Sequence, residues 1–298
     1  MEDYLITGTI FNNTVEVVAV ETTNISKVAS KFHKLSKGSN IMLAKTMTAS
    51  LLMSAFMKNE NENLTLSIDG NGKFGKIISV VNSQLDVRGC IQNTNIVLCE
   101  DLNAGNDGYI KIVRDIGFKE PYVGVTNLVT GNIEDDLEYY YSHSEQITSY
   151  FVIEETLEDE VKRIGGILVQ ILPGASDDTI KYLKQNRSRL KMFKDLLLKG
   201  YTLEEIIIYI FKEIKLKSNR RCQYKCNCSR EKMERGFMSL GKDEILKIMK
   251  EDGKASLECH FCGKRYVLSN EELKSIINDF WKNEQLGEYE RNYHKKAM

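Results

Sequence analysis

The stretch that decides the fold of the C-terminal region reads Cys226-Asn-Cys228 and, after thirty further residues, Cys259-His-Phe-Cys262. Each motif places two thiols one or two residues apart. Two such pairs can close on a single ion with the tetrahedral four-sulfur geometry typical of Zn²⁺. We therefore predict that Cys226, Cys228, Cys259 and Cys262 bind zinc.

The other cysteines are expected to stay outside this site. Cys222 lies four residues before the first motif and His260 lies inside the second. Either could replace one ligand, but because the other four cysteines form regular pairs, we expect neither Cys222 nor His260 to bind the metal. Cys90 and Cys99 have no base or metal ligand near them in the sequence, so we expect them to be structural thiols.

A zinc site would control whether this region folds. A segment of 60 to 75 residues has a marginal hydrophobic core, whereas structural zinc contributes about 10–16 kcal/mol of apparent binding energy. We expect the region to unfold when the metal is removed. Four thiolates on one divalent ion carry a net charge of −2, which Lys225, Arg230, Lys264 and Arg265 are placed to offset. Nearby cations also keep sulfur in the thiolate form that oxidants attack.

Each predicted ligand has a second thiol close to it in the chain. Disulfides Cys226–Cys228 and Cys259–Cys262 would use all four ligands and release the ion. A disulfide across one intervening residue is strained, so we expect it to be easily reduced again. A static structural zinc site is the alternative that these residues leave open.

The chain before the zinc region divides by charge and pattern. Residues 1–178 hold 14 Lys and Arg against 25 Asp and Glu, residues 179–221 hold 12 against 4, and residues 222–298 hold 15 against 13. We predict an N-terminal domain over 1–178, a helical linker over 179–221 and a zinc domain over 222–298. The basic linker either docks on the acidic domain or has a solvated lysine face.

The linker has the pattern of two helices. An apolar stripe at helical spacing ends near Lys199-Gly200. Thr202-Leu-Glu-Glu205 is then a capping box, in which threonine and glutamate satisfy each other's backbone amides. We expect the second helix to continue through Ile214 and Leu216, with apolar residues on more than one face, so that another part of the protein must cover it.

The N-terminal domain reads as α+β, with sheets and packed helices rather than a regular βαβ alternation. We predict strands over 5–11, 14–20, 64–68, 76–81, 96–99 and 109–115, and helices over 44–58 and 134–148. Gly70-Asn-Gly-Lys-Phe-Gly75 resembles a dinucleotide-binding loop, but a strand and not a helix follows it. We read 69–75 as a turn between strands.

Several functional classes are disfavoured. The start, MEDYLITGTIFNN, has no secretory signal, so we expect a cytoplasmic protein. The longest apolar run, Ile206 to Phe211, is far below the roughly 20 residues of a membrane span.

The four histidines (His33, His143, His260 and His294) have no catalytic constellation, and four sulfurs leave zinc no open position, so we expect no enzyme. The near-neutral zinc region makes nucleic-acid binding unlikely on charge grounds.

At the zinc motifs the chain resembles the 33-kilodalton heat-shock family of redox-regulated holdase chaperones, over nearly its whole length. The motifs that carry the resemblance are Cys226-Asn-Cys228-Ser-Arg230, Leu240-Gly-Lys-Asp-Glu-Ile245, Cys259-His-Phe-Cys262-Gly-Lys-Arg-Tyr266, Arg88-Gly-Cys90, Pro121-Tyr-Val-Gly124, Ser144-Glu-Gln146 and Gly165-Gly-Ile-Leu-Val-Gln-Ile-Leu-Pro-Gly-Ala175. Thr148 departs from the family, which usually has proline there.

The resemblance implies a zinc-bound inactive form and an oxidised active form. In the oxidised form zinc is released, two neighbouring disulfides form and the preceding linker unfolds. That form would hold unfolded client proteins without ATP hydrolysis, act as a homodimer and pass clients to ATP-dependent chaperones. The alternative function is a static zinc-domain protein that binds nucleic acid or a protein partner.

Overall fold

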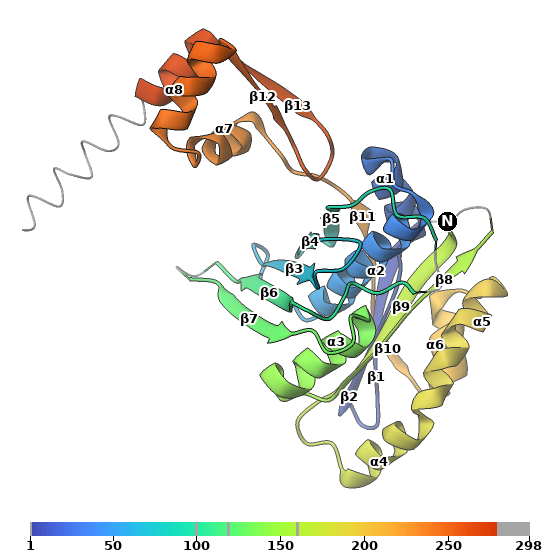
Figure 1. Ribbon diagram of the computed structural model, residues 1–298. Helices are drawn as coiled ribbons and strands as arrows, with labels where there is room; N and C mark the ends of the chain where they lie inside the picture. Colours follow the sequence, from blue (N-terminus) through green and yellow to red (C-terminus); the bar gives the residue numbers. More distant parts are fainter. Residues whose placement is uncertain (1, 99–100, 118–119, 159–160, 279–298) are drawn as a thin grey trace, which may run out of the picture. The chain divides into compact units, whose positions relative to one another are not determined.

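The computed structural model describes residues 2–98, 101–117, 120–158 and 161–278 (Figure 1). The chain forms two compact units, Met1–Cys226 and Asn227–Met298. Both contain helices and strands, so the predicted α+β class is confirmed. Among these described residues, no helix is both long enough and apolar enough to cross a membrane.

Two sheets form the framework of the first unit. Sheet A has the order β10-β1-β2-β9-β8, and sheet B has the order β11-β5-β4-β3-β6-β7. All neighbouring strands are antiparallel except β11 and β5. The strands of sheet A are β1 Tyr4–Ile10, β2 Val15–Glu21, β8 Ser149–Leu157, β9 Val161–Ile171 and β10 Lys215–Arg221. The strands of sheet B are β3 Asn63–Asp69, β4 Ile77–Asn82, β5 Asp86–Ile91, β6 Tyr109–Asp115, β7 Tyr122–Asn127 and β11 Gln223–Tyr224.

Helix α2, Lys37–Ser54, lies between the two sheets and contacts strands of both (Figure 1). Every residue of α2 except Lys37 and Lys45 is buried. Its small polar residues tolerate this because their hydroxyls bond to carbonyls of the preceding turn, as Thr46 does to Met42 at 2.9 Å. Both α2 and α1, Thr23–His33, therefore contribute side chains to the main core.

The opposite face of sheet A is covered by the segment that follows β9. The covering elements are α4 Asp177–Asn186, a 3₁₀ turn Arg187–Lys191, α5 Met192–Leu198 and α6 Leu203–Phe211. Their apolar side chains form a second core with the outer face of sheet A, and we call this segment, 177–211, the helical cover. The shared core consists of Ile6, Ile10, Val15, Val17, Ala19, Tyr150, Ile167, Val169, Ile171, Leu183, Leu190, Phe193, Leu196, Leu197, Leu203, Ile206, Ile207 and Ile210.

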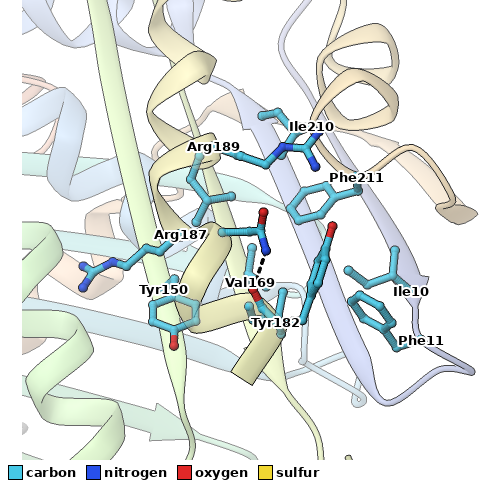
Figure 2. Close-up of a pocket in the computed structure, with 12 residues that line it drawn as sticks. Ile10, Phe11, Tyr150, Val169, Tyr182, Arg187, Arg189, Ile210 and Phe211 are labelled. Carbon is cyan, nitrogen blue, oxygen red and sulfur yellow. Dashed lines mark hydrogen bonds between the residues drawn. The ribbon is translucent and has the colours of Figure 1, made fainter. Parts of the chain in front are cut away.

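The helical cover leaves a gap at one end. A small pocket, with a cavity volume of about 30 Å³, opens between α4, α6 and sheet A (Figure 2). Phe11 and Tyr182 lie beside it, with ring centroids 5.4 Å apart and side chains partly exposed. Figure 2 also shows Val169 of the sheet and Phe211 of α6 lining the same space.

A buried ion pair links the helical cover to sheet A. Arg163 on β9 and Glu21 on β2 meet at 2.7 Å, with side-chain exposures of 11% and 1%. Arg163 Nη1 also donates to the carbonyl oxygens of Leu197 at 2.9 Å and Tyr201 at 3.0 Å. One guanidinium therefore satisfies both a buried carboxylate and the carbonyl end of α5, where a cation is favourable.

Some local predictions are confirmed. The chain turns between β3 and β4 at residues 70–76, as expected for the glycine-rich stretch. The capping box of α6 is present, because Glu205 N donates to Thr202 Oγ1 at 3.3 Å and Thr202 N donates to Glu205 Oε2 at 2.8 Å.

Others are wrong. The helix expected to continue through Ile214 and Leu216 ends at Phe211, and β10 follows, because pairing with β1 overrides local preference. Residues 96–98 form no strand, and Cys99 lies outside the described residues. The helix predicted over 134–148 is α3, Ile133–Tyr140, followed by a π-helical turn, Tyr141–Glu145.

The second unit is small. Its described elements are α7 Arg230–Met238, α8 Lys242–Glu251, β12 Lys254–Glu258 and β13 Arg265–Ser269, the two strands forming a hairpin. Its buried core consists of Phe237, Ile245, Ala255, Leu268, Leu273 and Ile277. A core of this size is marginal for an independent unit.

The buried pair predicts a measurable loss of stability. Arg163→Met should lower the free energy of unfolding by about 3–5 kcal/mol, because Glu21 would stay buried without its partner. The double variant Glu21→Gln with Arg163→Met should lose less than the two single losses combined. Denaturant unfolding followed by circular dichroism measures this. If the loss in the double variant equals the sum of the two single losses, Glu21 and Arg163 do not act as a unit.

Candidate metal centre

Four sulfur atoms converge at one point. The Sγ atoms of Cys226, Cys228, Cys259 and Cys262 all lie within 4.8 Å of one another. The Cys228 and Cys262 sulfurs are 3.5 Å apart. Four thiolates around zinc at about 2.3 Å would be separated by about 3.8 Å, so the cluster has the dimensions that a tetrahedral ion requires.

Two local structures present these thiols. Ser229, directly after Cys228, caps α7 by accepting from Lys232 N at 3.3 Å, which ends the extended stretch at the first motif. The second motif forms the turn of the β12–β13 hairpin. There the amides of Cys262 and Gly263 donate to the Cys259 carbonyl at 3.3 and 2.8 Å. Gly263 has φ +68°, a conformation that glycine adopts most easily.

Tyr266 on β13 borders the cluster. Its hydroxyl lies 3.2 Å from Cys228 Sγ and 3.3 Å from the Cys228 carbonyl oxygen. The hydrogen bond to Cys228 first, then burial and the charges of the cysteines, raise the pKa of Tyr266 to about 12. The phenol therefore stays protonated at neutral pH and can donate to sulfur. Sequence reasoning missed this residue, although the alternation of β13 places Tyr266 and Leu268 on its buried face.

The four cations expected to offset the thiolate charge do not all do so. Lys225 pairs with Asp86 at 3.0 Å, Arg230 pairs with Glu234 and Glu272, and Arg265 pairs with Glu258. Each of these three cations is paired with a carboxylate, so it offsets the thiolate charge less than a free cation would. Lys264 differs, because its Nζ lies 5.1 Å from the centre of the Tyr266 ring.

Cys222 and His260 lie outside the four-sulfur cluster. Cys222 is buried in the main core of the first unit, and its thiol donates to the Glu21 carbonyl oxygen at 3.7 Å. Burial, and then the carboxylates of Asp3 and Glu21, raise the pKa of Cys222. The thiol is thus protonated and unreactive while this core is folded. His260 is exposed, and Cys90 lies on β5 opposite Ile78.

Comparisons with known proteins agree along the whole chain. The family model described as Hsp33 protein matches residues 3–269. The 33 kDa chaperonin of Acetivibrio thermocellus is 38% identical over 289 residues, which cover 93% of this chain and 97% of that protein. The 33 kDa chaperonin of Clostridioides difficile is 33% identical over 94% of this chain and all of its own length.

A solved structure shares the fold. The crystal structure of the 33 kDa chaperonin from Thermotoga maritima superposes with a TM-score of 0.82 at 29% identity, covering 95% of this chain and 100% of the other. Sequence and structure point to one assignment. The chain belongs to the Hsp33 family of 33 kDa chaperonins.

Proposed function

We propose that this protein is a redox-regulated holdase chaperone, in which Cys226, Cys228, Cys259 and Cys262 bind zinc in the inactive form. One observation carries the proposal: the four sulfurs lie within 4.8 Å of one another, and three of them belong to the second unit, whose described residues form a buried core of six side chains. When bound, zinc would supply cross-links that this small core lacks. The donor set is all sulfur, which favours zinc over harder cations such as Mg²⁺.

Oxidation would take these cross-links away. A thiolate attacks the O–O bond of a peroxide, forms a sulfenic acid and releases hydroxide. A second thiolate then displaces the oxygen and forms a disulfide. Two peroxide molecules would convert the four thiolates to Cys226–Cys228 and Cys259–Cys262. Disulfide sulfurs no longer hold the ion, and the second unit would unfold.

The helical cover is the proposed output of the switch. It buries an apolar face of sheet A through eighteen shared core residues, so its loss would expose a large apolar surface. Reburial of such surface is worth about 25 cal/mol per Å², and unfolded client proteins can supply it.

Electrostatic contacts support docking of the basic segment rather than a purely solvated lysine face. Ion pairs join Arg187 to Glu138 at 2.7 Å, Lys194 to Glu154 at 3.0 Å, Lys217 to Glu16 at 3.9 Å and Arg221 to Glu2 at 3.4 Å. Each crosses between residues 179–221 and the acidic region before them. These ion pairs partly neutralise the positive charge of residues 179–221. This favours the chaperone over a nucleic-acid-binding zinc protein.

The remaining features of the proposal come from the family. We propose division into an N-terminal domain, 1–178, a redox-responsive linker, 179–221, and a zinc domain, 222–298. The oxidised form is proposed to be a homodimer in the cytoplasm. It is proposed to hold unfolded clients, catalyse no reaction and release clients to ATP-dependent chaperones.

Metal removal tests the first step. Cys262→Ser should lose the bound ion, and the amides of the β12–β13 hairpin should then lose protection from hydrogen exchange. Zinc content by mass spectrometry and exchange by mass spectrometry measure the two effects. Cys222→Ser is the matched control, because that thiol lies outside the cluster, and it should keep one zinc per chain. A hairpin that stays protected after chelation would rule out metal-dependent folding.

Peroxide treatment at elevated temperature tests the coupling. We expect zinc release, loss of four free thiols and suppression of the aggregation of a denatured enzyme to appear together, and a thiol reductant to reverse them. Light scattering, a zinc dye and thiol titration follow the three signals. Release of zinc with no gain in suppression would contradict the proposal.

Charge reversal tests the docking of the helical cover. Lys194→Glu should weaken docking by about 0.5–1 kcal/mol, since the affected pair with Glu154 is partly exposed. The oxidised variant should activate at a lower temperature than the parent protein. Lys199→Glu is the control, because Lys199 is exposed and has no ion pair among the described contacts. Identical shifts in both variants would attribute the effect to net charge alone.

A further inference from the structure

Strand β10 protects the edge of sheet A. It is the outermost strand of that sheet, and four of its seven residues are Lys or Arg. Its pairing with β1 shifts register between Thr7 and Gly8. Charged residues and bulges are the features by which natural edge strands avoid pairing with other chains.

Strand β1 beneath it has the opposite character. Its sequence, YLITGTI, holds neither a charged residue nor a proline, and all of its residues except Tyr4 are buried. Its other side pairs with β2 along the whole strand. Without β10, the sheet would end in seven uncharged residues with an unpaired row of backbone groups. A strand of this kind is a template for another extended chain.

The attachment of β10 leads directly to the candidate metal centre. After β10 the chain makes only the two-residue strand β11, which pairs with β5. Lys225 N then donates to the Val87 carbonyl at 2.9 Å, and the next residue is Cys226. A metal at Cys226 would thus hold the C-terminal end of this segment, and unfolding of the second unit would free it.

We propose that release of β10 opens the edge of β1, and that an extended, uncharged segment of an unfolded client adds there as a new strand. This inference rests on the chaperone function proposed above and specifies how clients are bound. The edge already accommodates an extended peptide, namely β10 itself. A segment with high β-propensity and low charge is also the kind that aggregates, so the edge would select the clients most in need of protection.

One position along the edge adds side-chain specificity. Gly8 has no side chain, and a Cβ built there would lie 2.9 Å from Ile214 Cδ1. Ile214 therefore fills the space over this glycine. When the segment leaves, that space becomes available to an apolar side chain of the client strand. Backbone pairing with a pocket for alternate side chains is the usual form of strand addition.

Two peptides of equal length test the preference. The first alternates Val and Thr with one solubilising Lys at each end, and the second has Pro at two central positions. Oxidised, zinc-free protein should bind the proline peptide at least about tenfold more weakly, because proline cannot donate to the ladder. The reduced zinc-bound form should bind neither. Equal affinities for both peptides would overturn strand addition.

Hydrogen exchange locates the binding. The amides of residues 4–10 that lose protection on oxidation should regain it when the Val-Thr peptide is bound. Those of β2, which is paired on both sides, serve as the internal control and should stay protected throughout. Edge amides that keep exchanging while the peptide is bound would also overturn the inference.

A disulfide that fastens β10 to β1 gives an independent test. Thr7 Oγ1 and Ser218 Oγ lie 2.8 Å apart, so Thr7→Cys with Ser218→Cys should join β10 to β1 by a disulfide. The oxidised double variant should release zinc yet bind the peptide at least about tenfold more weakly than the single variant Thr7→Cys.

Aggregation assays separate failure of strand addition from failure of the chaperone function. If oxidised parent protein suppresses aggregation but its β1 edge stays open, strand addition fails and the chaperone function stands. If it suppresses nothing, the proposed function itself fails.

Discussion

The convergence of the Cys226, Cys228, Cys259 and Cys262 sulfurs within 4.8 Å joins the first cysteine motif to the turn of the β12–β13 hairpin. Among the described residues the unit has α7, α8, a helix that begins at Asn270 and the β12–β13 hairpin, packed around six buried apolar side chains. The thiols come from two motifs thirty residues apart, so anything that binds them closes a long loop. The same chemistry that makes sulfur a good zinc ligand makes it open to oxidation. In the function proposed above, the same atoms would supply both the stability of the second unit and its sensitivity to oxidants.

The first unit is built so that loss of one segment has large consequences. Sheet A is apolar on both faces: one packs on α2, and the other is covered by α4, α5 and α6. The covering helices belong to a basic segment that is attached through the shared apolar core, ion pairs and one buried guanidinium. Arg163 makes the most specific of these contacts, since it joins β2, β9 and the end of α5.

Exposed ion pairs add about 0–1 kcal/mol each, and they weaken as salt rises. Those that join the helical cover to the acidic region therefore add little to the apolar core that the cover shares with sheet A. Cys222 lies only four residues before Cys226, but its thiol packs in the main core of the first unit, whereas the Cys226 sulfur lies in the four-sulfur cluster.

The cysteine spacing predicted which four thiols come together, and the patterns of the chain predicted an α+β fold. Local sequence could predict each pair of Cys226, Cys228, Cys259 and Cys262, because thiols one or two residues apart must lie close together. Capping at Thr202 and the turn before β4 were predictable for the same reason. Tertiary structure decided what depends on distant partners. The helix predicted through Ile214 and Leu216 gives way to β10 because β1 offers an edge. Tyr266 reaches sulfur only through the hairpin. Lys225 and Arg230 show the same dependence, because their partners Asp86 and Glu272 lie far from them in the sequence.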